Sequence, residues 1–398
     1  MDNNSKTILF ITDLLVDSRV QELAGISEIA AKVGWHVEYV ETSRLQQSIA
    51  KTVAYWTPAG CILEGHDSGI PSDLSIESIP TVHLDPSESV LDNPRFSTVT
   101  NDAPRIVDLA IRELSLAGSE HFAFISWMTP VGWSQRRQDL FSRLLSNIGR
   151  NGFVLDASSA MGDVTEFTSQ VRTLLTKLPR RCGIFAANDY VASIVLSLCK
   201  IEGLRVPGDF YVVGVDDNPN FCDNTHPSLT SIRPDFTTGG RMAAWMLARR
   251  MASPNSPPEK ELYHPCWMTR RLSTRHVVSN SANVLQALDK IRREACSGLK
   301  AADVVREMGL SERMAEMTFK AATSKRITEE ITDVRLERVK ELLSRPSQAI
   351  APIANLCGWD GEIYLKRLFK QRTGMTMREW RAKQGGLGNQ RGPASKLC

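Results

Sequence analysis

The sequence of 398 residues has no long apolar run near its start, no closely spaced pair of cysteines and none of the short motifs of common enzymes. Its first apolar run, residues 7–11, follows a polar start and is soon interrupted by Asp13. That run is too short for a secretion signal or a membrane span. We therefore expect a cytoplasmic protein without membrane contact.

Cysteines are few and dispersed. The eight cysteines form no C-x-x-C pair, and they form no Cys/His cluster with the spacing of a metal site. Such a pattern is typical of reduced, buried thiols, and disulfides and zinc are not expected. We expect neither a metal nor any other cofactor.

Catalytic signatures are missing as well. No P-loop, nucleophile elbow or Gly-rich dinucleotide loop is present, and no repeat of 20–50 residues is visible. Asp216 and Asp217 could be considered as a paired acid and base. Adjacent residues of a strand point to opposite faces, however, so both cannot reach one substrate. We expect no enzymatic activity.

The net charge of +3 conceals a division along the chain. Residues 285–383 carry 20 Lys and Arg against 14 Asp and Glu, whereas residues 1–284 carry 26 against 31. A basic C-terminal third on an acidic body is expected when one end of a protein meets a polyanion.

Short apolar runs alternate with stretches of helical period over the first 274 residues. One helix is expected over 20–33, ending at Gly34, and the Pro-rich segment 251–261 is expected to be a surface loop. Strands are expected within 7–15, 36–42, 60–65, 79–85, 96–102, 121–127, 152–158, 183–190, 210–219 and 263–274. Strands separated by helices predict βαβ units and a parallel, doubly wound sheet.

Several motifs stand in order within this part. They are Ala-Asn-Asp at 187–189, Pro-x-Asp-x-x-Val-Val-Gly-x-Asp-Asp at 207–217, Pro-x-Leu-Thr-Ser-Ile at 227–232 and Gly-Arg-Met-Ala at 240–243. Residues 5–274 thereby resemble the effector domains of the LacI/GalR family, which have a periplasmic-binding-protein-like fold. The resemblance implies two α/β lobes that close on a small molecule.

Ligands of open α/β sheets bind outside the carboxyl ends of the strands. Asn188, Asp189 and Asp216 fall at expected strand ends, and their amide and carboxylate groups suit vicinal sugar hydroxyls. Asp189 could instead cap the following helix.

Further effector contacts are expected around the same cleft. The resemblance places an effector-contacting arginine at Arg137, and Asp13 and Arg19 are expected to face the cleft from the other lobe. Trp127 and Trp133 could stack on a sugar ring or belong to the core.

The stretch from Ser347 to Arg381 predicts a helix, a turn at Gly358 and a basic second helix. We expect this second helix to direct Tyr364 inward and its cations outward. The order Ile-x-x-Ile-Ala-x-x-x-Gly-Trp, Leu-Lys-Arg-Leu-Phe-Lys and Thr-Gly-Met-Thr-Met-x-x-Trp-Arg resembles the C-terminal signature of AraC/XylS-family transcription regulators. The resemblance implies sequence-specific DNA binding.

A first helix-turn-helix unit is expected over 301–323, with a turn at Gly309 and Ser311 as a helix cap. A linker helix over 331–343 would join the two units. Ala315, Met317 and Ser324 depart from the leucine, arginine and glycine common in the family, which implies a weaker first unit. The candidate DNA contacts are Arg313, Glu316, Lys320, Arg335, Asp360, Gly361, Glu362, Lys366, Arg367 and Lys370. Asp360 could instead be only a helix cap.

The whole chain therefore predicts an α/β two-lobed periplasmic-binding-protein-like domain followed by an all-α double helix-turn-helix domain. The expected boundaries are 1–274, a linker over 275–283, a DNA-binding domain over 284–384 and a disordered tail over 385–398. This layout resembles that of xylose-operon regulators of the AraC family.

The layout implies a regulator of a carbohydrate-utilisation operon that senses xylose or a related monosaccharide. Its expected partners are a double-stranded DNA operator, the sugar, a second copy of the chain in a homodimer, and RNA polymerase. Two alternatives stay open: a DNA-binding regulator that has lost its sugar and responds to protein partners, and a sugar-binding protein with a vestigial DNA domain.

Overall fold

The computed structural model describes residues 6–12, 16–41, 49–65, 79–264, 266–275, 282–343 and 349–386. The chain divides into two compact units, Met1–Arg275 and His276–Cys398. Asp13, most of the expected linker and most of the expected tail lie outside the described residues.

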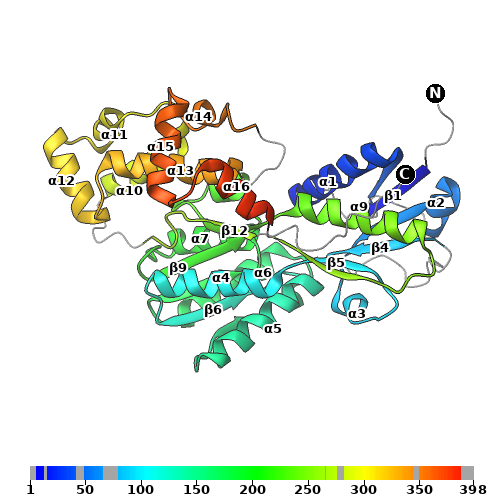
Figure 1. Ribbon diagram of the computed structural model, residues 1–398. Coiled ribbons are helices and arrows are strands. Elements are labelled where there is room, and N and C mark those ends of the chain that lie inside the picture. The colour runs from blue at the N-terminus through cyan, green and yellow to red at the C-terminus, as the bar shows by residue number, and fades with distance from the viewer. Residues whose placement is uncertain are drawn as a thin grey trace. The chain divides into compact units, whose positions relative to one another are not determined.

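The first lobe of the N-terminal unit contains a parallel sheet with the order β11-β5-β4-β3-β1-β2 (Figure 1). Its strands are β1 (Lys6–Thr12), β2 (Trp35–Glu41), β3 (Gly60–Glu64), β4 (Thr81–Leu84), β5 (Thr98–Asn101) and β11 (Lys260–Tyr263). The accompanying helices are α1 (Asp17–Val33), α2 (Ile49–Trp56), α3 (Glu88–Leu91) and α9 (Phe236–Ala252). Helix α1 ends at Gly34, which has a φ of 74°, as the sequence predicts.

Helices α1 and α9 lie side by side at very short range (Figure 1). A Cβ atom on Gly240 would lie 2.0 Å from the backbone oxygen of Glu22, and one on Gly25 would lie 2.1 Å from that of Thr237. Glycine is required at both positions because any side chain would overlap the facing backbone. This contact fixes the position of Glu22 near Arg19, Glu64, Asp85 and Asp216, which are described below.

The second lobe contains a sheet with the order β12-β10-β9-β8-β6-β7, in which only β12 is antiparallel to its neighbour. Its strands are β6 (His121–Ile125), β7 (Phe153–Leu155), β8 (Cys182–Ala186), β9 (Phe210–Val215), β10 (Thr230–Pro234) and β12 (Cys266–Thr269). Its helical segments are α4 (Ala103–Leu116), α5 (Gly132–Asn147), η3 (Ser158–Ala160), α6 (Val164–Lys177), α7 (Asp189–Ile201) and α8 (Pro219–Cys222). Apolar cores lie on both faces of this sheet.

The chain passes between the two lobes three times: after β5, after β10 and after β11. The lobes also touch directly, because Arg136 of α5 pairs with Glu88 of α3 and donates to the backbone oxygen of Pro86 at 3.4 Å. The prediction of a two-lobed, doubly wound α/β domain is confirmed. The carboxyl-end loops of both sheets supply the cleft residues.

The C-terminal unit is entirely helical over its described residues. Its elements are α10 (Ala282–Glu294), η4 (Ala295–Ser297), α11 (Ala301–Met308), α12 (Glu312–Thr323), α13 (Ile327–Leu343), α14 (Ile353–Leu356), α15 (Glu362–Thr373) and α16 (Met377–Gly386). Helices α11 and α12 form one helix-turn-helix unit, α14 and α15 form the second, and α13 contacts both. The predicted double helix-turn-helix arrangement is confirmed.

The second helices of the two units, α12 and α15, correspond to each other at a spacing of fifty residues. Thr323 and Thr373 both donate to the backbone oxygen four residues earlier, at 2.8 and 2.7 Å. Ser324 and Gly374 end the two helices with left-handed φ values of 61° and 74°. The correspondence is hard to see in the sequence because few side chains are identical.

Three details of this unit correct the sequence prediction. The N-cap of α15 is Gly361, so Asp360 is not the cap, and α14 has only a single turn. Tyr364 is 52% exposed and does not point inward. Arg335 does not point outward: its guanidinium donates to the backbone oxygens of Ala295 and Leu299 at 2.8 and 3.1 Å.

Candidate effector cleft and nucleic-acid interface

Arg137 and Asp216 lie at the carboxyl-end side of the second lobe's sheet. Arg137 of α5 is buried, donates to the backbone oxygen of Ala187 and lies with its Cζ 4.9 Å from the centroid of the Trp133 ring. Burial lowers the pKa of Arg137, and the negative charge of Asp216 opposes that fall. The arginine therefore belongs to a charged cluster that includes Asp216.

Asp216 directly follows β9 and has a φ of 109°, a conformation that non-glycine residues rarely adopt. Burial raises the pKa of Asp216 to about 6, against the lowering effect of the Arg137 and Arg19 charges. Its carboxylate makes no hydrogen bond within the described ranges, although its backbone N–H donates to Ile232 at 2.7 Å. A strained backbone presenting an unpartnered carboxylate is the arrangement expected of a ligand contact.

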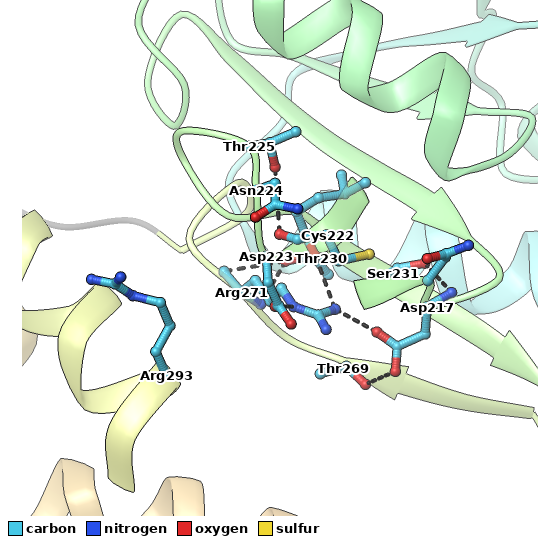
Figure 2. Close-up of polar contacts among 12 residues, drawn as sticks. Asp217, Cys222, Asp223, Asn224, Thr225, Thr230, Ser231, Thr269, Arg271 and Arg293 are labelled. Atoms are coloured by element: carbon cyan, nitrogen blue, oxygen red, sulfur yellow. Dashed lines mark hydrogen bonds and ion pairs between the residues drawn. The ribbon is translucent and has the colours of Figure 1, made fainter. Parts of the chain in front are cut away.

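The side chain of Asp217 lies in a polar network with Thr269 and Arg271 (Figure 2). Its carboxylate accepts from Thr269 Oγ1 at 2.8 Å and from the guanidinium of Arg271. Arg271 also donates to Asp223 at 3.1 Å and to the backbone oxygen of Leu229 at 3.1 Å (Figure 2). This network holds the loop after β9, and it keeps the two adjacent carboxylates apart.

The side chains of Asn188 and Asp189 accept hydrogen bonds from other groups of the second lobe. Asn188 caps α7, since its side-chain oxygen accepts from the N–H of Val191 at 3.0 Å. The buried carboxylate of Asp189 accepts from Ser231 Oγ at 2.5 Å and from the N–H of Asn218 at 2.8 Å. Both Asp189 oxygens thus accept hydrogen bonds inside the lobe and support the loop that carries Asp216.

The first lobe contributes a second charged cluster at its own strand ends. Arg19 of α1 pairs with Glu64, the last residue of β3, and Glu64 also accepts from Thr12 Oγ1 at 2.7 Å. Asp85 follows β4 and accepts from the side chain of Asn101 at 2.9 Å and from the hydroxyl of Tyr263 at 2.6 Å. Burial raises the pKa of Tyr263, which keeps it a neutral donor.

Glu22 of α1 is fully buried, and neither of its carboxylate oxygens has a hydrogen-bond partner within the described part of the chain. Burial raises the pKa of Glu22 far above its ordinary range, while the Arg19 charge opposes the rise. The charges of Glu64, Asp85 and Asp216 raise it further. Glu22 therefore joins the clusters of the two lobes into one acidic centre.

Half-buried aromatic side chains border this centre on the second lobe. The Trp127 ring lies 6.2 Å from that of Trp133 and 5.7 Å from that of Tyr190, and Tyr190 lies 5.6 Å from Phe221. Trp127 follows β6, Trp133 and Tyr190 lie at the starts of α5 and α7, and Phe221 lies in α8. All four residues therefore lie at the carboxyl-end edge of the sheet. The arrangement supplies an apolar wall beside the polar groups.

The exposed faces of α12 and α15 form the candidate nucleic-acid interface. Arg313 and Lys320 are exposed on α12, and Glu316 is partly exposed there. The exposed residues around the start and along the outer face of α15 are Asp360, Gly361, Ile363, Tyr364, Lys366, Arg367 and Lys370. Glu362 pairs with Lys366 at 2.8 Å, and Arg367 lies over the Tyr364 ring at 6.0 Å.

Two residues of the first helix-turn-helix unit that differ from the family pattern, Ala315 and Met317, change its core and its surface. Ala315 is fully buried at the position where the second unit has Leu365, so the first unit fills less of its core. Met317 is 56% exposed at the position where the second unit has Arg367. The first unit thus has one cation fewer on its outer face.

Family comparisons agree with both units. A family described as a periplasmic binding protein-like domain matches residues 111–274, and a helix-turn-helix domain family matches residues 304–383. The fold and these matches define a protein with the layout of a transcription regulator, in which a periplasmic-binding-protein-like domain is followed by a helix-turn-helix domain.

The chain is similar to xylose operon regulatory proteins over most of its length. It is 26% identical to that of Escherichia coli K12 over 379 residues, covering 94% of this chain and 96% of the relative. The protein of Haemophilus influenzae is also 26% identical, with 94% and 97% covered.

Solved structures show the same fold. The xylose-binding transcription activator xylR has a TM-score of 0.60 and 23% identity, with 96% of this chain and 99% of that chain covered. A complex of the transcriptional regulator CelR with cellobiose has a TM-score of 0.57 and 20% identity, with 68% and 85% covered. No helix in the described part of the chain is long and apolar enough to cross a membrane.

Proposed function

We propose that this regulator binds an uncharged monosaccharide between its two lobes and a DNA operator through α12 and α15. The observation that carries the sugar site is Asp216, whose backbone is strained and whose carboxylate makes no hydrogen bond within the described part of the chain. Carboxylates bind the hydroxyl groups of a sugar, and an aromatic ring covers the apolar face of the sugar ring. Xylose is the first candidate because the names of two relatives and one structural neighbour refer to it.

The charge of the cleft favours a neutral sugar over a sugar phosphate. Arg19 already pairs with Glu64, and Arg137 already donates to the backbone oxygen of Ala187. Asp85 and Asp216 bring further carboxylates to the same centre. A phosphate dianion would meet repulsion there and would find both arginines occupied.

We infer that the cleft binds its ligand without transforming it. Asp216 faces the acidic centre, whereas Asp217 is held by Arg271 and Thr269, so the pair offers no acid and base on one substrate. A cytoplasmic location, a homodimer and contact with RNA polymerase are part of the same proposal, and all three rest on the resemblance to known regulators.

A thermal-shift screen of monosaccharides and their phosphates on the full-length protein tests the sugar site. At a ligand concentration of about 100 times Kd, binding stabilises the folded state by about 2.7 kcal/mol. We expect a neutral pentose to raise Tm in the wild type and to have no effect in Asp216→Ala. A Tm rise only with phosphorylated sugars, or an undiminished rise in Asp216→Ala, would contradict the proposal.

A further inference from the structure

Helices α12 and α15 are built on one scaffold but present different chemistry. Phe319 and Phe369 are fully buried at equivalent positions, and the threonines and left-handed residues that end the helices also correspond. With the cores aligned in this way, exposed Arg313 of α12 corresponds to exposed Ile363 of α15. The equivalent position therefore carries a cation in one unit and an aliphatic side chain in the other.

Ile363 lies in the first turn of α15 and is 85% exposed. A single exposed aliphatic residue would need no explanation elsewhere on a surface. Here it shares the outer face of α15 with exposed Arg367 and Lys370. The first turn of the second helix is the part of a helix-turn-helix unit that meets base edges, and cations around it meet phosphates.

The positive charge of Arg367 and Lys370 on this face favours DNA over a second copy of the protein as the binding partner. A second copy of the same face would place like charges of Arg367 and Lys370 against each other, which is unfavourable. DNA offers phosphates to those cations, and its major groove offers one aliphatic group, the C5-methyl of thymine. An isoleucine has no hydrogen-bonding atoms in its side chain, so the other base edges would leave their polar groups unpaired against it.

We propose that Ile363 contacts the C5-methyl group of a thymine in the subsite read by α15. This inference rests on the proposed DNA binding and specifies one base of the operator. The equivalent Arg313 of α12 does not read a methyl group, so the two subsites bound by one chain differ at this position. The operator is then read in a fixed orientation by each chain.

The test begins with binding sites selected from a randomised duplex library by the full-length protein in the presence of xylose. Each thymine of the selected site is then replaced singly by deoxyuridine, which removes the methyl group and keeps the base pair. Fluorescence anisotropy at fixed salt gives Kd for the wild type, Ile363→Ala and, as the matched control, Arg313→Ala.

One deoxyuridine replacement is expected to weaken binding by about three- to fivefold in the wild type and in Arg313→Ala, the size expected for one buried methyl group. In Ile363→Ala the same replacement should have almost no effect. The proposal is overturned if no replacement weakens binding, or if the effect persists in Ile363→Ala. It is equally overturned if Ile363→Ala leaves Kd unchanged and alters the oligomeric state in sedimentation. Failure to select any DNA sequence is a distinct result, because it rejects the proposed DNA binding itself.

Discussion

The charges of Arg137 and Asp216 act directly on each other in the cleft. The Arg137 guanidinium opposes the rise in the Asp216 pKa, and the Asp216 carboxylate opposes the fall in the Arg137 pKa. Neither effect outweighs burial, so the pKa of Asp216 stays raised, at about 6. A ligand that donates hydrogen bonds to the carboxylate would stabilise its charged form.

Replacement of Asp216 by asparagine should stabilise the protein without ligand. An unfolded aspartate is ionised above about pH 4, whereas the folded carboxyl holds its proton up to about pH 6, so stability falls as pH rises through that window. The loss, about 1–3 kcal/mol, remains at neutral pH. We expect Asp216→Asn to raise Tm at pH 7 by about 2–6 °C and to flatten the dependence of Tm on pH. An unchanged Tm and slope would contradict this account of the buried carboxylate.

Asp209 provides a control of opposite sign on the same lobe. Hydrogen bonds from Arg205, at 2.8 Å and 3.1 Å, lower the pKa of Asp209 to about 2. The stability from this pairing is present above about pH 4 and is lost as pH falls through the folded pKa. Asp209→Asn should therefore lower Tm at pH 7, and differential scanning calorimetry compares both variants. A rise in Tm for Asp209→Asn would show that the signs are not set by the local charges.

Arg271 should be essential for the loop that presents Asp216. Its side chain is only 5% exposed and pairs with Asp217 and Asp223. Arg271→Ala leaves a buried carboxylate without its partner, which costs about 3–5 kcal/mol of folding stability. Arg112 of α4 is 70% exposed and its partner Asp108 is 30% exposed, so Arg112→Ala should cost about 1 kcal/mol or less. Urea unfolding of the two variants measures the contrast, and equal losses would refute the assigned role.

Arg367 and Arg335 should behave differently toward DNA. Exposed Arg367 is proposed to meet a phosphate, so Arg367→Ala should weaken binding to all sequences and reduce the salt slope by about 1. Arg335 is turned to the backbone oxygens of Ala295 and Leu299, so Arg335→Ala should lower Tm and leave the salt slope unchanged. Anisotropy titrations at several salt concentrations test both. The assignment fails if the two variants exchange these effects.

Ser324 should destabilise the first helix-turn-helix unit slightly. Its φ of 61° lies in the left-handed region, where the second unit has Gly374. A non-glycine residue there costs about 1 kcal/mol or more, so Ser324→Gly should stabilise the helical unit and Gly374→Ser should destabilise it. Amide hydrogen exchange measures the change in the free energy of unfolding of the helical unit in each variant. Destabilisation by Ser324→Gly would show that the serine side chain compensates for the strain.

Much of the fold could be predicted because local signals agreed with one another. Alternating strand and helix patterns predicted βαβ units and a parallel sheet, and Gly34 marked the end of α1 as expected. The division into two lobes was implied by the resemblance to LacI/GalR effector domains. The correspondence of α12 and α15 is hard to see in the sequence because only their buried residues and helix ends match. Their exposed residues, such as Arg313 and Ile363, differ. Tyr364 was misplaced because an apolar ring beside Leu365 looks like core in sequence.

The cleft could be predicted only in part. The rule that ligands lie at strand ends indicated Asp216, and it applies equally to Glu64 and Asp85, which also end or follow strands. Glu22 gave no such signal, because its burial depends on the close packing of α1 on the distant Gly240. Asp189 was assigned to the ligand because sequence cannot show that Ser231 and Asn218 already use its oxygens.

Regulation by a sugar requires that sugar binding between the two lobes changes the affinity of α12 and α15 for DNA. The affinity of the full-length protein for its selected operator, measured with and without saturating sugar, tests this requirement directly. A coupling of about five- to 150-fold is the usual range, and we expect a change within it for the wild type and none for Asp216→Ala. Equal operator affinities with and without a sugar that demonstrably binds would contradict the account.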